Sequence, residues 1–286
     1  MDYSTPKPVV SIIGEFWAMT TEGDGNYHMH RFLEQEGAEV HIQSITNWLL
    51  FLVWEAGHDT KKRMELRWDD EARKGLAGKN ATKKLWSLKV ADTAIRGIFQ
   101  AYANALGLHG HHLPDIQHYA DLAGKYYDTD VRGGESYMEV GKLIHFVQDQ
   151  VTHMTVSVKP FGCMPSSGVS DGVQSFVTTR WPDAIFAPIE TTGDSAVNAQ
   201  SRVQMMLFKA RQKAFDEFER ALDESGLDEA SFKARLARNR LGGAFRRPRH
   251  RVAGTSANLA YALASRRDRA RRWVRHQARR VLRHTS

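Results

Sequence analysis

A strand–helix–strand pattern at the start of the chain constrains the fold more than any other feature of the sequence. The apolar, β-branched run VVSII at 9–13 ends at Gly14 and is typical of a strand that is buried on both faces. A polar loop follows, and we expect Asn26 to cap a helix that ends at Gly37. Residues 38–42 then form a second strand. Two strands joined by a helix form a βαβ unit, which predicts a parallel sheet.

The chain continues with helices placed around two further strands. Apolar residues recur at helical spacing from about 47 to 150, which predicts a large helical insertion. Further strands are expected at 152–158 and 184–189, and further helices at 170–181 and from about 197 to 224. The sequence therefore predicts the α/β class, with a parallel sheet and a helical insertion about 47–150.

Positive charge is concentrated at the C-terminal end of the chain. From Lys233 to Ser286 there are 17 Lys and Arg residues and one acid, Asp268, which gives a net charge of +16. Residues 1–232 carry 23 basic and 32 acidic residues, a net charge of −9. We expect an α/β lobe at 1–232 and an Arg-rich tail at 233–286 that is partly helical, around 259–274, or disordered. Charge alone would let such a tail contact nucleic acid or acidic lipid, but a solvated tail is the simpler interpretation, so nucleic-acid binding is not expected.

The single cysteine, Cys163, points to a reducing compartment. One cysteine cannot form a disulfide within the chain. No run of about 18 uncharged apolar residues is present, so no membrane span is expected. Residues 1–8 lack the basic and apolar segments of a signal peptide. We therefore predict a cytoplasmic protein.

The loop KPFGCMP at 159–165 is the main candidate site, because it directly follows a predicted strand of the parallel sheet. Ligands of open α/β sheets bind beyond the carboxyl ends of the strands. Prolines stiffen this turn, and Gly162 would let the backbone approach a neighbour or a ligand closely. Cys163 is either a nucleophile or ligand for a soft metal centre, or a small buried apolar residue. The chain alone lacks the four thiolates usual for an iron–sulfur cluster.

Two neighbouring loops are weaker candidates. Residues 166–172 open a helix, so their backbone amides either bind an anion or are simply capped by Ser170 or Asp171. Residues 128–135 combine acids and glycines with Arg132, which either pairs with an anionic ligand or belongs to a capped turn ending at Glu135. Glu15 also lies at this edge of the sheet. No Walker A or dinucleotide-binding fingerprint is present, so nucleotide binding is not supported.

A group of histidines follows residue 108. His109, His111, His112 and His118 are close in sequence, but they lack the helical i, i+4 pairing with a nearby acid that zinc hydrolases show. A zinc site is therefore not predicted there. No Ser-His-Asp arrangement is recognisable either.

Several of these motifs together resemble a known superfamily. KPFGCMP at 159–165, RGGE at 132–135, Asp171-Gly172 and SRVQ at 201–204 resemble the 2-hydroxyacyl-CoA dehydratase and benzoyl-CoA reductase superfamily, and most closely its activase-related members. The opening strand and GAEV at 37–40 are similar to the start of the C-terminal lobe of that family, and the resemblance spans about 8–222.

The resemblance implies a flavodoxin-like lobe in which Cys163 is a ligand of an iron–sulfur cluster, expected to be of the 4Fe–4S type. Lys159, Gly162, Arg132 and Glu135 would line the cofactor site. In such systems an ATP-dependent activator delivers an electron that drives the reduction or dehydration of an acyl-CoA. The preceding lobe of the family, which supplies further cysteines, and the ATPase module are not recognised in this chain.

Three functions remain open at this point. The leading hypothesis is an iron–sulfur lobe or subunit that shares its cluster with a cysteine-bearing partner. The second is a non-catalytic binding or assembly module, or a truncated inactive form, with the same fold. The third assigns the function to the basic tail.

Overall fold

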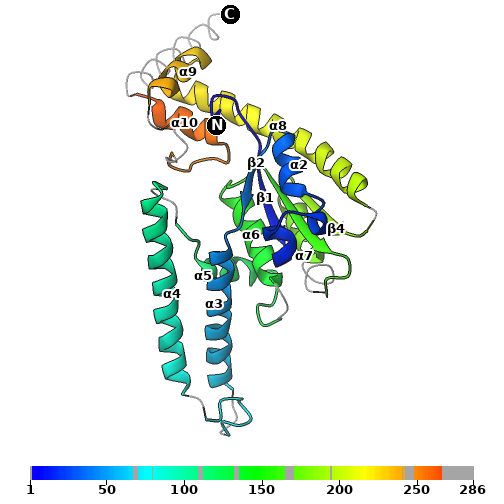
Figure 1. Ribbon diagram of the computed structural model, residues 1–286, viewed down its shortest axis with the longest axis vertical. Helices are drawn as coiled ribbons and strands as arrows, with labels where there is room; N and C mark the ends of the chain where they lie inside the picture. The colour runs from blue at the N-terminus through cyan, green and yellow to red at the C-terminus, as the bar shows by residue number, and fades with distance from the viewer. Residues whose placement is uncertain are drawn as a thin grey trace, which may run out of the picture.

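The chain forms a parallel sheet covered by helices on both faces (Figure 1). The computed structural model describes residues 2–66, 70–78, 80–108, 112–131, 135–164, 171–193, 195–239, 241 and 248–265. Its sheet consists of β1 (Val9–Gly14), β2 (Glu39–Ile42), β3 (Met154–Pro160) and β4 (Ile185–Thr191), in the order β2-β1-β3-β4. All three pairings are parallel. The predicted α/β class is confirmed, and this strand order is consistent with a flavodoxin-like lobe.

Side chains along the central strands of the sheet point alternately toward two helical layers. Val10 and Ile12 of β1 face a core that includes α1 (Phe16–Thr20), α2 (Met29–Gln35) and α8 (Ala196–Ser225). Ile13 instead faces a core with α3 (Ile45–Met64), α5 (Ile116–Ala123), α6 (Ser136–Gln148) and α7 (Asp171–Arg180). Every residue of β1 is buried, as expected of a strand covered on both faces.

The helical segment between β2 and β3 has two structurally different parts. The helices α3 (Ile45–Met64) and α4 (Ala81–Ala105) lie side by side as a long hairpin that projects away from the sheet (Figure 1). Side chains at both N-caps fix where they begin, since Ser44 accepts from the amide of Asn47 and Asn80 accepts from that of Lys83. The other two helices, α5 and α6, return to cover the sheet. The predicted insertion is therefore a projecting hairpin followed by part of the sheet-covering layer.

One local prediction was wrong. Asn26 does not cap a long helix but ends a short 3-10 turn, η1 (Asp24–Asn26), and α2 begins at Met29. The buried Asn26 amide donates to the carbonyl oxygens of Ala18 and Thr21. This side chain therefore holds the loop between α1 and α2 together.

The C-terminal part of the described chain packs on the far end of α8. The helices α9 (Glu229–Arg238) and α10 (Thr255–Leu263) share an apolar cluster with α8 that includes Phe218, Phe232 and Leu259. The α9 helix runs across residue 232, where the sequence suggested that the basic tail begins. The described part of the predicted helix at 259–274 is the end of α10, and residues 266–286 lie outside the described residues. Across the described residues, we find no helix with the length and apolar character needed to cross a bilayer.

Candidate functional site

The carboxyl ends of β1 and β3 form the point where the connections of the sheet diverge. The chain leaves β1 toward the layer of α1 and α2, whereas it leaves β3 toward α7 in the opposite layer. In open α/β sheets such a switch point opens a crevice where ligands bind. The loop that carries Cys163 follows β3 and therefore lies at this point.

A tight turn shapes the Cys163 loop. The amide of Phe161 donates to the carbonyl oxygen of Thr191 at 3.0 Å, and the amide of Cys163 donates to that of Pro160 at 3.1 Å. Gly162 has a φ of +73°, a left-handed conformation that glycine adopts without strain. Among the described residues, a Cβ at Gly162 would meet no atom within 4 Å, so no neighbouring segment of this part of the chain requires a glycine there. Glycine is needed here for the conformation of the turn.

The loop exposes apolar side chains on both sides of the thiol. Phe161 is 73% exposed and Met164 is 79% exposed, while Cys163 is partly buried and is not part of a disulfide. The sequence left open whether Cys163 is a buried apolar residue, and its partial exposure argues against that interpretation. These two exposed side chains offer apolar surface to another molecule next to the thiol.

Beneath this edge, the α6-facing side of β3 is polar. Thr155, Ser157 and Lys159 alternate with apolar residues along the strand, and all three are buried. Lys159 pairs in register with Glu190 of β4, which places opposite charges on neighbouring strands. The predicted site residue Lys159 therefore lies within the fold below the Cys163 loop rather than on its surface.

Three charged residues of α6 and its N-cap are buried against this side of the sheet. Glu135, Glu139 and Lys142 are each less than 5% exposed. Ser157 donates to a carboxylate oxygen of Glu139 at 3.4 Å, and the Lys142 ammonium donates to the side-chain oxygen of Gln43. The cluster thus connects α6 to β3 and to the end of β2.

Burial favours the neutral forms of two members of this cluster, Glu135 and Lys142. Desolvation raises the pKa of Glu135 to about 7, although the nearby Lys142 acts in the opposite direction. Desolvation also lowers the pKa of Lys142 to about 8, with Glu135 and Glu139 opposing that change. A carboxyl with a pKa near 7 is suited to accept or release a proton at neutral pH.

An unpaired amide lies on the helix that follows the Cys163 loop. The side chain of Gln174 in α7 is fully buried, and neither its oxygen nor its nitrogen has a hydrogen-bond partner in the described structure. Buried amides are normally paired, so this group has capacity for a polar partner.

The structure brings together some of the predicted site residues and leaves others outside its description. Glu135 and Lys159 both lie on the α6 side of the sheet, and Cys163 lies at its carboxyl edge. Arg132 and residues 165–170 lie outside the described residues, so the predicted anion loop and the Arg132 contact stay predictions.

Sequence reasoning missed Glu139 and Lys142. The available signal was their spacing, because Glu135, Glu139 and Lys142 follow one another at i, i+4 and i+7 and so share one face of a helix.

Comparison of the chain with models of protein families, with curated proteins and with solved structures found no match.

Proposed function

We propose that this chain is an iron–sulfur component of an electron-transfer system of the 2-hydroxyacyl-CoA dehydratase type, in which Cys163 supplies one thiolate ligand. The sequence resemblance around residues 159–165 motivates the proposal. The position of Cys163 at the switch point of the sheet, between two exposed apolar side chains, is the observation that carries it.

The residues of this chain do not hold such a cluster alone. Iron–sulfur clusters are commonly bound by four cysteine thiolates, and the chain has one cysteine. The proposal therefore requires a cysteine-bearing partner that covers the Cys163 loop. Phe161 and Met164 supply apolar surface for that contact, of the kind found at the centres of protein interfaces.

The chain's own residues have defined parts in this proposal. Gly162 sets the turn that presents Cys163, and the buried Lys159 and Glu135 lie on the α6 side of the sheet, where they would influence a bound cluster through its surroundings. An ATP-dependent activator is the expected electron donor, and an acyl-CoA is the expected substrate class of the assembled system. A chain with a single cysteine suits the reducing cytoplasm.

A second candidate function is a binding or assembly module that uses the same loop without a cluster. The presence of one cysteine in the whole chain favours this alternative, because docking through Phe161 and Met164 requires no metal.

Partner capture and cluster content distinguish the two functions. The full chain would be purified without oxygen together with proteins that it retains, as wild type and as the Cys163→Ser and Phe161→Ala/Met164→Ala variants. The proposal predicts that Cys163→Ser keeps a cysteine-bearing partner but loses iron and sulfide, whereas the apolar variant loses the partner. A retained partner with equal iron in wild type and Cys163→Ser contradicts the role of Cys163. A partner that is retained without iron in the wild type favours the assembly module.

A further inference from the structure

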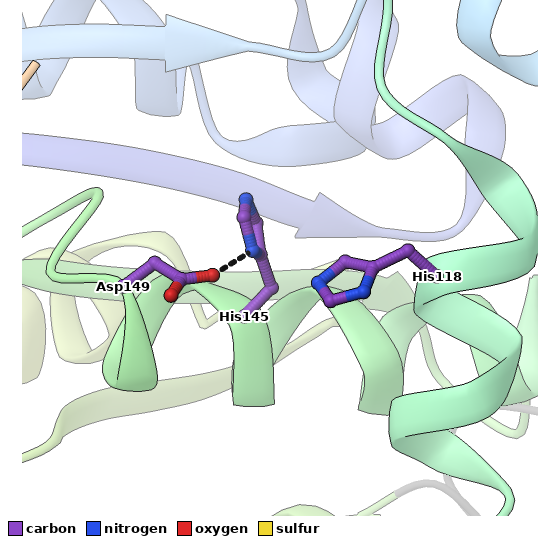
Figure 2. A group of neighbouring side chains, drawn as sticks. All are labelled: His118, His145 and Asp149. Atoms are coloured by element: carbon purple, nitrogen blue, oxygen red, sulfur yellow. Dashed lines mark ion pairs between the residues drawn. The ribbon is translucent and has the colours of Figure 1, made fainter.

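Two histidines and an aspartate from two helices meet near the C-terminal end of α6. His145 and Asp149 are one helical turn apart on α6, and His118 comes from α5 (Figure 2). One ligand atom of each residue lies within 4.8 Å of one ligand atom of each of the others. Of the histidines that lie near His118 in the sequence, His109 and His111 lie outside the described residues and His112 bonds to Gln100.

His145 and Asp149 pair a histidine with an acid at i, i+4, and the second histidine comes from another helix. Nδ1 of His145 lies 2.6 Å from a carboxylate oxygen of Asp149. Figure 2 shows the ring of His118 directed toward His145 from the neighbouring helix. The centres of the two imidazole rings are 5.6 Å apart, and the rings are nearly perpendicular. The three side chains thus converge on one small region.

Packing fixes the central histidine while the other two remain accessible. The ring of His145 contacts the rings of Tyr119 and Phe146, with centres 5.4 and 5.9 Å away. His118 and Asp149 are exposed. No hydrogen bond in the described part of the chain occupies either ring nitrogen of His118, so either nitrogen of this exposed ring can present its lone pair to a ligand, according to the tautomer. A site with one rigid donor and two accessible donors can be reached from solvent.

A third histidine supports the backbone at this point. His250, from the segment that precedes α10, donates from Nε2 to the carbonyl oxygen of Asp149 at 3.1 Å. This bond ties the C-cap of α6 to the C-terminal part of the chain and helps to hold the Asp149 backbone in place.

We propose that His118, His145 and Asp149 bind a divalent transition-metal ion of the zinc class. Two imidazoles and one carboxylate are the donor set of three-ligand zinc sites, which leave a further position open to water or another ligand. Ligand distances of about 2.0–2.2 Å require the three donor atoms to draw together slightly, and the exposed His118 and Asp149 have the freedom to do so. Nδ1 of His145 is buried and makes no hydrogen bond in the described structure, so the ion would give this nitrogen a partner.

The proposed metal site is separate from the Cys163 site. At a rise of about 1.5 Å per residue, Glu135 and Asp149 are about 21 Å apart along α6. Glu135 precedes α6 at the carboxyl edge of the sheet, whereas Asp149 ends the helix next to the start of β3. The two proposals can therefore fail or succeed independently.

Zinc titration of the full chain tests the site. The chain would be treated with a chelator, dialysed and titrated with Zn²⁺ against a chromophoric indicator, as wild type and as His118→Ala, Asp149→Ala, His112→Ala and Cys163→Ser. We expect one strongly bound ion per chain in wild type, His112→Ala and Cys163→Ser. The affinity should fall by about tenfold or more in His118→Ala and Asp149→Ala.

Thermal unfolding separates a lost ligand from a lost fold. Both substituted side chains are exposed, so His118→Ala and Asp149→Ala should unfold at temperatures close to that of the metal-free wild type. Zinc should then raise the unfolding temperature of wild type and His112→Ala but not of the two ligand variants. Absence of stoichiometric zinc binding in wild type, or equal affinity in wild type and His118→Ala, would overturn the proposal.

Discussion

A Cβ atom on Gly14 would lie 2.0 Å from the carbonyl oxygen of Val158, closer than any real contact allows. Gly14 ends β1 with a φ of +125°, and the next residue, Glu15, donates its amide to that same carbonyl at 3.0 Å. The carboxyl ends of β1 and β3 therefore meet through a position that only glycine can occupy. The switch point at which the Cys163 loop lies depends on this contact.

Substitution of Gly14 should disrupt the sheet. We expect Gly14→Ala to lower the free energy of unfolding by about 3 kcal/mol or more, because both the backbone conformation and the contact with Val158 are lost. Gly97 is the matched control, since it lies within α4 and a Cβ there would meet nothing within 4 Å. Gly97→Ala should raise stability by about 0.5–1 kcal/mol. Denaturant unfolding of both variants measures the difference, and equal effects would contradict the role of Gly14.

Glu135 should make stability depend on pH below neutrality. Its pKa is about 7 in the folded chain against an ordinary value of 4.5, so the folded state binds more protons than the unfolded state between these values. The free energy of unfolding should therefore fall as pH rises from about 4.5 to 7, by an amount on the order of 3 kcal/mol from this residue alone. Glu135→Gln should flatten that slope, whereas Glu34→Gln on the exposed surface of α2 should not. An unchanged slope in Glu135→Gln would show that the residue does not titrate in this range.

The buried imidazole of His153 connects three parts of the chain. Its Nδ1 accepts from the amide of Val9, and its Nε2 donates to Glu217 of α8 at 3.3 Å. The same carboxylate oxygen of Glu217 accepts from the amide of Gly254 at 2.7 Å, just before α10. These bonds link the start of β1 to the C-terminal helices.

Removing Glu217 should weaken this link. Burial alone would raise the pKa of Glu217, but the bonds from His153 and the backbone of the C-terminal segment outweigh it and hold the pKa below its ordinary value. The Glu217 carboxylate therefore stabilises the fold fully at pH values above 4.5, its ordinary pKa in the unfolded chain. This stabilisation is lost as the pH falls through the lower pKa that Glu217 has in the folded chain. We expect Glu217→Ala to cost about 2–4 kcal/mol at pH 7, because it leaves buried donors unpaired. Asp216→Ala, which alters the neighbouring exposed position of α8, is the control, and equal unfolding curves for the two variants would contradict the account.

The strands were predictable because their signals are local. The run at 9–13 is apolar except for Ser11, residues 154–158 alternate apolar residues with Thr and Ser, and the parallel order follows from the helices between the strands. The Asn26 cap failed because its side chain bonds to Ala18 and Thr21, which are separated from it by a loop. A capping rule considers only the residues that follow the cap.

The two candidate sites differ in whether consecutive residues of the sequence are enough to recognise them. The Cys163 loop could be recognised from its own residues, because it follows a strand and carries the only thiol. The meeting of His118 with His145 and Asp149 could not, because it depends on the packing of α5 against α6. The burial of Lys142 and Glu139 is likewise a consequence of how α6 lies on the sheet.

Iron and sulfide analysis after anaerobic purification tests the central claim most directly. The chain would be isolated with its retained partner, and wild type would be compared with Cys163→Ser by metal content and absorption spectrum. The account predicts iron and sulfide in the wild-type complex and their loss in Cys163→Ser while the partner is retained. A wild-type complex without iron, or a Cys163→Ser complex with as much iron as the wild type, would contradict it.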